Sequence, residues 1–148
     1  MPVRTGQAIW EGSLKRGKGE METESGALKA SYTFGSRFQQ KKGSNPDELI
    51  AAAHAGCFSQ ALALVLGEKG FEPTRIETTA KVTIKDVDGA PTITSSKLTS
   101  EAAVPEIEEN TFREIASKAK EVCPVSRALG AISVEVDVKL VPESYIVS

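Results

Sequence analysis

The chain has 148 residues and a formal net charge of −2, with 40% hydrophobic and 26% charged residues. This composition is typical of a folded soluble protein and excludes a disordered chain. The 18 basic residues are spread along the sequence, so the concentrated cationic surface that nucleic acid binding requires is not expected.

The N-terminal segment from Val3 to Phe38 predicts a small antiparallel sheet. It is rich in Gly, Thr and Ser, and turn residues near Gly12–Gly17 and Ser25–Gly26 divide it. The β-type stretches between these turns are Gln7–Trp10, Gly19–Thr23 and Leu28–Phe34. Their spacing predicts a three-stranded meander.

A long helix is predicted to begin after the loop Lys41-Lys42-Gly43. Asn45 suits the N-cap, Pro46 the first turn, and the two following acidic residues favour its positive end. Glu48, three residues after Asn45, completes a capping-box pattern. The helix is predicted to end near Gly67–Gly70.

The uncharged part of this helix, Leu49–Leu66, approaches the length of a membrane span. Polar residues at His54, Ser59 and Gln60 interrupt it, so we interpret it as a buried helix and expect no membrane partner. A helix that is apolar all round needs protein packed around it on every side. A domain this small cannot supply that cover alone, and we expect part of it from a second subunit.

The remaining residues predict a hairpin, a helix and a final strand. Asp88-Gly89 is a hairpin signal, and Pro124 is placed to open a short turn. The predicted elements are strands at Arg75–Asp86, Thr92–Val104 and Ile132–Val141, and an amphipathic helix at Ile107–Val122 with Phe112, Ile115, Ala116 and Ala119 on one face. With no repeat or linker, the order predicts a single α+β domain over residues 1–148.

Two cysteines are the residues most able to carry chemistry. Cys57 lies within the apolar helix, where a lone cysteine is commonly a small core residue. Cys123 precedes Pro124 at a helix end, where free backbone N–H groups lower the pKa of a thiol. The pair indicates either buried structural cysteines or a redox couple. The segment MPVRTGQAIWEG has no apolar run typical of a secretory signal, so we expect a cytoplasmic protein without a permanent disulfide.

His54 and Glu48 each allow two interpretations. His54, three residues before Cys57, is either a hydrogen-bonded interior histidine or the base of a Cys–His pair. Glu48 either caps the helix or positions an arginine. Nine residues separate it from Cys57, which is half a turn out of phase and roughly 13 Å along the axis. An arginine must therefore span the gap, or two subunits must share the site.

Two arginines are candidates for a site cation, and a metal is not expected. Arg37 lies between Phe34 and Phe38 just before the helix, whereas Arg16 lies in an exposed glycine-rich turn. One histidine and two distant cysteines give poor support for zinc.

The motifs then indicate a family. The run GSNPDELIAAAHAGCFSQALALVLGEKGF and the segment KAKEVCPVS resemble the OsmC/Ohr family, and GQAIWEGSLKRGKG and ESG resemble its OsmC branch. The resemblance implies an intertwined homodimer with antiparallel sheets around two central helices. It also implies that Cys57 is the peroxidatic thiol and Cys123 the resolving thiol, with Arg37 and Glu48 completing the site. Arg16 is the alternative arginine, because the Ohr branch takes its arginine from nearer the N-terminus.

The function implied is a thiol-dependent peroxidase acting in oxidative and osmotic stress defence. It would reduce organic hydroperoxides, and hydrogen peroxide less efficiently, through a Cys57 sulfenic acid and a Cys57–Cys123 disulfide. An external dithiol, lipoyl-type by family analogy, would restore the thiols without cofactor or metal. Phe34, Phe38 and Phe58 are expected beside an apolar substrate. The alternatives are a non-catalytic dimeric stress-related binding protein with structural cysteines, and an acyl transferase or hydrolase with His54 as base.

Overall fold

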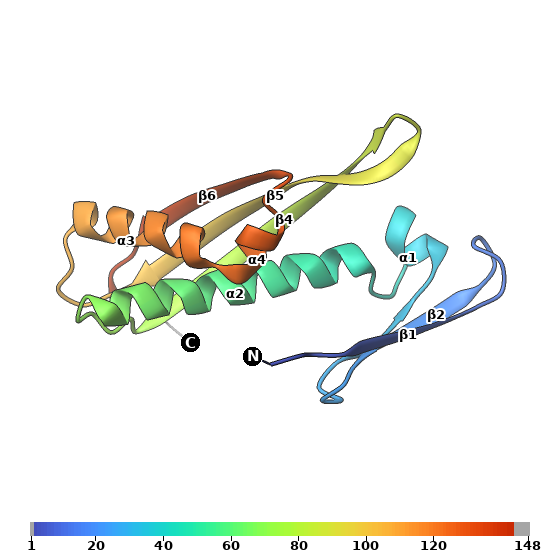
Figure 1. Ribbon diagram of the computed structural model, residues 1–148, viewed down its shortest axis with the longest axis horizontal. Coiled ribbons are helices and arrows are strands. Elements are labelled where there is room, and N and C mark those ends of the chain that lie inside the picture. Colours follow the sequence, from blue (N-terminus) through green and yellow to red (C-terminus); the bar gives the residue numbers. More distant parts are fainter. Residues whose placement is uncertain (1, 144–148) are drawn as a thin grey trace. The chain divides into compact units, whose positions relative to one another are not determined.

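The computed structural model describes residues 2–143, which divide into two compact units between Leu49 and Ile50. Each unit has a three-stranded sheet of its own (Figure 1). The long helix α2 (Pro46–Glu68) contributes its first residues to the N-terminal unit and the others to the C-terminal unit. The expected single domain over residues 1–148 stays a prediction.

The N-terminal sheet is the predicted antiparallel meander, in the order β1-β2-β3. Its strands are β1 (Gly6–Glu11), β2 (Lys18–Thr23) and β3 (Lys29–Tyr32). Gly19 on the middle strand pairs with Trp10 on one side and Tyr32 on the other. The two aromatic rings close over it with centroids 5.3 Å apart, and a Cβ at Gly19 would lie 2.6 Å from both. The glycine is therefore needed for this close packing.

A short helix, α1 (Phe34–Phe38), follows β3 and was not predicted. The predicted strand Leu28–Phe34 ends early because Thr33 caps a helix. Its Oγ1 accepts a hydrogen bond from the Ser36 N–H at 3.0 Å, and Ser36 Oγ accepts one from the Thr33 N–H at 2.8 Å. This reciprocal pair satisfies two backbone donors that a helix start leaves free.

The C-terminal unit is a mixed sheet in the order β4-β5-β6. Its elements are β4 (Arg75–Val87), β5 (Ala90–Ala103), α3 (Glu109–Val122), α4 (Pro124–Ala128) and β6 (Ser133–Leu140). The predicted β4–β5 hairpin is confirmed, with positive φ at Asp88 (52°) and Gly89 (83°). The expectation of purely antiparallel sheets is wrong here, because β6 pairs parallel to β5. Helices α3 and α4 carry the chain back past the end of β5, so that β6 can run in the same direction as β5. A parallel pair requires such a crossover connection.

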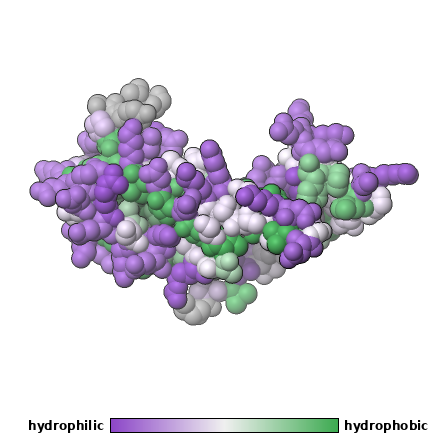
Figure 2. All heavy atoms as spheres, turned by 90° about the horizontal axis from the view of Figure 1, so that it is seen from above, coloured by the Kyte–Doolittle hydropathy of each residue, from purple (hydrophilic) through white to green (hydrophobic). Residues whose placement is uncertain are grey.

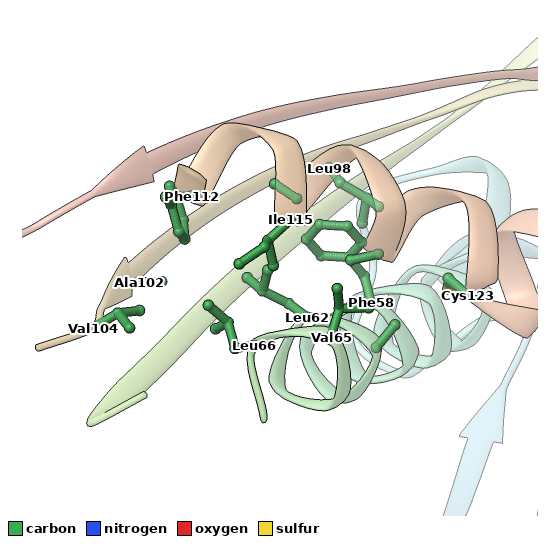
Figure 3. Close-up of a cluster of buried hydrophobic side chains, with 13 residues drawn as sticks. Phe58, Leu62, Val65, Leu66, Leu98, Ala102, Val104, Phe112, Ile115 and Cys123 are labelled. Carbon is green, nitrogen blue, oxygen red and sulfur yellow. The ribbon is translucent and has the colours of Figure 1, made fainter. Parts of the chain in front are cut away.

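The hydrophobic core lies between α2, α3 and the inner face of this sheet (Figure 3). Buried side chains alternate along β5 while their neighbours Lys97 and Thr99 are exposed. The predicted buried face of α3 is confirmed. The largest core side chains are Phe58, Leu62 and Leu66 from α2, Leu98 from β5, and Phe112 from α3. Burying each contributes roughly 1.5–3 kcal/mol, so this cluster fixes the part of α2 that carries Cys57.

One face of α2 remains uncovered, although the helix was expected to be buried on most sides. Its exposed residues are Ala52, Ala53, Gly56, Gln60 and Leu64. Leu64 is 58% exposed. By length and composition alone α2 is a helix that could cross a membrane, a property it shares with core helices of soluble proteins. Figure 2 shows apolar side chains at the surface among the polar ones.

Candidate active site

The two cysteines meet in the C-terminal unit, although 66 positions separate them in the sequence. Cys57 lies near the middle of α2 and is partly exposed, whereas Cys123 is fully buried at the junction of α3 and α4. The Cys123 thiol donates to the Cys57 sulfur, with the two sulfur atoms 3.3 Å apart. This contact brings together the two thiols of the predicted redox pair, without a bond between them.

The surroundings of Cys57 favour the neutral thiol. Burial raises its pKa, and the nearby Cys123 adds to the increase. A hydrogen bond from the Val125 backbone N–H acts in the opposite direction and lowers the pKa. Because the thiolate is the nucleophilic form, Cys57 requires further stabilisation by positive charge to react at neutral pH.

His54 is an interior histidine with both ring nitrogens hydrogen-bonded. Nδ1 lies 2.7 Å from Ser96 Oγ, and Nε2 lies 2.8 Å from Ser126 Oγ. The ring is fully buried, and burial lowers its pKa. These contacts confirm the interior-histidine interpretation. They disfavour His54 as a base for Cys57, because neither nitrogen is directed to the thiol.

Arg37 forms an ion pair with Asp47 in the N-terminal unit. Its Nε donates to Asp47 Oδ2 at 3.0 Å and its Nη2 to Asp47 Oδ1 at 3.2 Å. The Arg37 side chain is 38% exposed and that of Asp47 is 8% exposed. The guanidinium carbon lies 5.2 Å from the centre of the Phe38 ring. A two-point ion pair of this kind orients the guanidinium plane as well as its charge.

Asp47, and not Glu48, is the carboxylate on Arg37 within one chain. Glu48 is exposed, and its Oε2 accepts a hydrogen bond from Ser44 Oγ at 2.7 Å. Asn45 Oδ1 accepts from the Glu48 N–H at 2.7 Å, which confirms Asn45 as the N-cap. One helical step rotates a side chain by about 100°, which separates the two acidic residues. A role of Glu48 in a site shared between subunits stays a prediction.

The sequence did contain a signal for Asp47. It lies seven residues, or two helical turns, before His54, so both side chains belong to the inward face of α2. Both are buried. The alternative arginine, Arg16, lies in the exposed turn after β1, as expected.

The aromatic residues expected beside the substrate separate into two groups. Phe58 is fully buried in the core cluster, so its expected place beside the substrate is wrong. The reason is that Phe58 falls on the inward face of α2. Phe34 and Phe38 instead line a cavity of about 440 Å³ in the N-terminal unit, together with Trp10, Leu14, Tyr32 and Arg37. Among residues 2–143, no three His, Cys, Asp or Glu side chains are grouped so as to hold a metal.

The family follows from a comparison with known proteins. Residues 39–139, a span that includes both cysteines, match the family described as OsmC-like protein. The chain belongs to the OsmC family. This confirms the family that the two sequence motifs indicate.

Named relatives identify the enzyme class of this OsmC protein. Peroxiredoxin OsmC of Escherichia coli K12 is 56% identical over 129 residues, which cover 86% of this chain and 90% of that protein. Organic hydroperoxide resistance protein-like 1 of Staphylococcus saprophyticus is 30% identical over 128 residues, covering 83% and 88%. The chain is therefore a cysteine-based peroxidase, as expected from the sequence.

Solved structures confirm the OsmC-like α+β fold. An organic hydroperoxide resistance protein from Elizabethkingia anophelis, with crystallant-derived thiocyanate bound, aligns with a TM-score of 0.71 and 25% identity. The alignment covers 95% of this chain and 99% of that one. An OsmC-like protein from Mycoplasma pneumoniae aligns with a TM-score of 0.75 at 16% identity, covering 95% and 98%.

Proposed function

We propose that this OsmC protein reduces organic hydroperoxides to alcohols by a two-cysteine cycle. The observation that carries the proposal is the 3.3 Å contact between Cys57 and Cys123 inside one compact unit. Cys57 is the partly exposed member and is assigned as the peroxidatic thiol. Cys123 is fully buried behind it and is assigned as the resolving thiol.

The cycle conserves atoms and electrons over three steps. The Cys57 thiolate attacks the terminal oxygen of the hydroperoxide, the O–O bond breaks, and the departing alkoxide takes a proton to become an alcohol. Cys57 is then a sulfenic acid. The Cys123 sulfur attacks it, the hydroxyl leaves as water with the Cys123 proton, and a disulfide forms. An external dithiol donates two electrons and two protons, and its own disulfide is released.

Arg37 is proposed as the cation that stabilises the Cys57 thiolate and the peroxide oxygens. An arginine keeps its charge at every working pH and presents a planar set of donors. Its two-point pairing with Asp47 supports the assignment, because it limits the orientations that the guanidinium can adopt. Glu48 and Arg16 stay as candidates for the same site.

The preference for organic over inorganic peroxide is proposed from the aromatic cavity beside Arg37. Its wall is mainly apolar, with aromatic rings from both edge strands and from α1. An alkyl or aryl tail would gain roughly 25 cal/mol per Å² of apolar surface buried there. Hydrogen peroxide has no such tail and would bind without this contribution.

A homodimer is proposed from the uncovered face of α2. Apart from Gln60, the face consists of small and apolar residues, and a Cβ added at Gly56 would meet nothing within 4 Å. A second copy of the helix would remove this surface from water. Leu64→Glu should therefore lower the molar mass in light scattering to that of a monomer, whereas the outer-face change Thr99→Glu should leave the mass of a dimer.

The physiological setting is proposed as the cytosol under oxidative or osmotic stress, with a lipoyl-type dithiol as reductant. A pair of free thiols that closes and reopens is consistent with a reducing compartment. Reduction rates with dihydrolipoamide and with glutathione would compare a dithiol with a monothiol.

The deciding experiment is thiol counting and intact mass after one equivalent of cumene hydroperoxide. The wild-type protein should lose two thiols and two mass units as the disulfide forms. The Cys123→Ser variant should retain a sulfenic acid at Cys57, which dimedone will trap. If neither cysteine reacts faster than a free thiol in solution, the proposed cycle is wrong.

A further inference from the structure

His54 is a fully buried polar side chain that joins three elements of the C-terminal unit. It projects from α2, and its two nitrogens contact Ser96 on β5 and Ser126 on α4. Both serines are also buried. Burying an imidazole without hydrogen-bond partners would cost free energy. Both contacts therefore help to offset the cost of burying His54.

Helix α4 and its N-cap supply two groups that act on the Cys57 sulfur. Cys123 is its N-cap and donates its thiol proton to Cys57. The Val125 backbone N–H, which lowers the pKa of Cys57, belongs to the first turn of the same helix. Ser126, the next residue along, is the one that His54 holds. The hydrogen bond to His54 is therefore adjacent to the groups that define the surroundings of the reactive thiol.

Helix α4 is too short to fix its own direction. It has five residues, and Cys123 is both the C-cap of α3 and the N-cap of α4, with an extended backbone. A single turn of helix is unstable by itself, because nucleation is unfavourable. A side-chain bond to α2 supplies a fixed point. Since His54 lies one turn before Cys57 on the same helix, the fixed point and the reactive sulfur move together.

We propose that His54 is a positioning residue for the peroxidase reaction. Through Ser126 it holds α4 so that the Val125 N–H and the Cys123 thiol both contact the Cys57 sulfur. This inference rests on the proposed two-cysteine cycle. His54 exchanges no proton with substrate, and its task is to keep α4 in place while the sulfur–sulfur separation shortens from 3.3 Å to the bond length of about 2.05 Å.

Two substitutions at position 54 separate the two hydrogen bonds. A glutamine amide extends to about the position of His Nε2, so His54→Gln retains a group for Ser126 and loses the contact to Ser96. An asparagine amide extends to about the position of Nδ1, so His54→Asn does the reverse. Ser126→Ala breaks the same bond as His54→Asn, from the α4 side.

Ser100→Ala is the matched control. Ser100 is as fully buried as Ser96 and lies on the same strand, but its partner is Thr78 Oγ1 at 2.9 Å on β4. The Ser100→Ala substitution therefore removes a buried hydroxyl without removing a contact to α4. If His54→Asn fails to fold, Ser126→Ala carries the test, since it removes one hydroxyl oxygen only.

Two readouts report on the position of α4 without any peroxide. The first is the pH profile of Cys57 alkylation by iodoacetamide, with peptide mapping to separate Cys57 from Cys123. The second is the equilibrium of the Cys57–Cys123 disulfide with glutathione. Ser126→Ala and His54→Asn should slow alkylation at pH 7 about tenfold, the effect of losing one hydrogen bond to a charged sulfur. They should also shift the glutathione equilibrium toward the dithiol. His54→Gln and Ser100→Ala should stay within about twofold of wild type.

If the Ser126→Ala variant is alkylated at the wild-type rate and its glutathione equilibrium is unchanged, the inference is wrong. An equal decrease in Ser100→Ala would also overturn it, because the effect would then be a general loss of packing. The result is separable from the proposed function. Failure of wild-type protein to reduce cumene hydroperoxide would refute the cycle while the alkylation data still show whether His54 positions α4.

Discussion

The thiol pair and the arginine pair differ in almost every physical respect. Cys57 and Cys123 lie against a packed apolar core, and the surroundings of Cys57 favour its neutral form. Arg37 lines an aromatic cavity and pairs with Asp47, and its guanidinium is partly exposed and permanently charged. The first site has the two sulfur atoms in contact, and it requires positive charge to stabilise a thiolate. The second has the charge but no redox atom.

Under the proposed cycle, the thiol pair and the arginine pair would have different tasks. Packing in the C-terminal unit fixes the separation of the sulfurs, a task that requires close-packed neighbours on several elements. A cation would be destabilised in such surroundings, whereas Arg37 remains partly exposed to water in the N-terminal unit. We therefore expect substitutions at the two sites to change different measured properties.

The largest effect is expected at Cys57 itself. Cys57→Ser should abolish peroxide consumption, because a serine hydroxyl in this environment is not ionised at neutral pH. Cys123→Ser should retain one rapid turnover per subunit and then stop. Stopped-flow measurement with cumene hydroperoxide distinguishes the two. Equal loss of the first turnover in both variants would contradict the assigned roles.

The next effect concerns stability and separates the two sites. Phe58→Ala should lower the free energy of unfolding by about 3–5 kcal/mol, because it leaves a cavity in the core beside Cys57. Phe38→Ala, at a ring that is 41% exposed beside Arg37, should change it by less than about 1 kcal/mol. Urea unfolding measures both, and comparable losses would show that the arginine site is also part of the core.

A change of charge at the arginine site should affect rate instead of stability. Arg37→Met should slow the reaction of Cys57 with peroxide by about 100-fold, as expected for loss of a preorganised donor near developing charge. Asp47→Asn should have a smaller effect of about tenfold, because the guanidinium remains but loses its ionic partner. Glu48→Gln is the matched control one residue away, and Arg16→Met tests the alternative arginine. A larger effect at Glu48 than at Asp47 would favour a carboxylate from a second subunit.

The smallest effect is a pH dependence of stability due to His54. Burial holds the pKa of the folded state below the unfolded value of 6.5. Above pH 6.5 both states are neutral and His54 has no effect. As the pH falls below 6.5, the unfolded state alone binds a proton, so stability decreases by up to about 1.4 kcal/mol per pH unit until the folded pKa is reached. Urea unfolding of His54→Gln between pH 7 and 5 should lack this decrease, while other titrating groups are common to both proteins.

Local sequence signals predicted most of the fold. Asn45 and Pro46 mark the start of α2, and Asp88-Gly89 marks the hairpin, because backbone conformation at these positions depends on nearby residues. The spacing of Phe112 and Ile115 predicted the buried face of α3 correctly. The parallel pairing of β6 was not predictable in this way, since strand direction depends on how intervening helices return the chain.

The candidate site was less accessible to sequence reasoning. Cys57 and Cys123 were identified as a pair, but their contact depends on the packing of α2 against the α3–α4 junction. Glu48 was predicted as the carboxylate that positions an arginine, but within one chain Asp47 pairs with Arg37, because one residue changes helical phase by about 100°. Ser126 gave no sequence signal, since its importance comes from a histidine 72 positions away.

The contact between the two sulfurs also bears on survival at high peroxide concentrations. A sulfenic acid that persists can react with a second peroxide and reach the irreversible sulfinic and sulfonic states. Under the proposed cycle, the resolving thiol Cys123 lies 3.3 Å from the Cys57 sulfur, so no large segment must unfold before it can attack. Intramolecular capture should therefore outcompete overoxidation, and the enzyme is suited to work through a burst of oxidant instead of being inactivated by it.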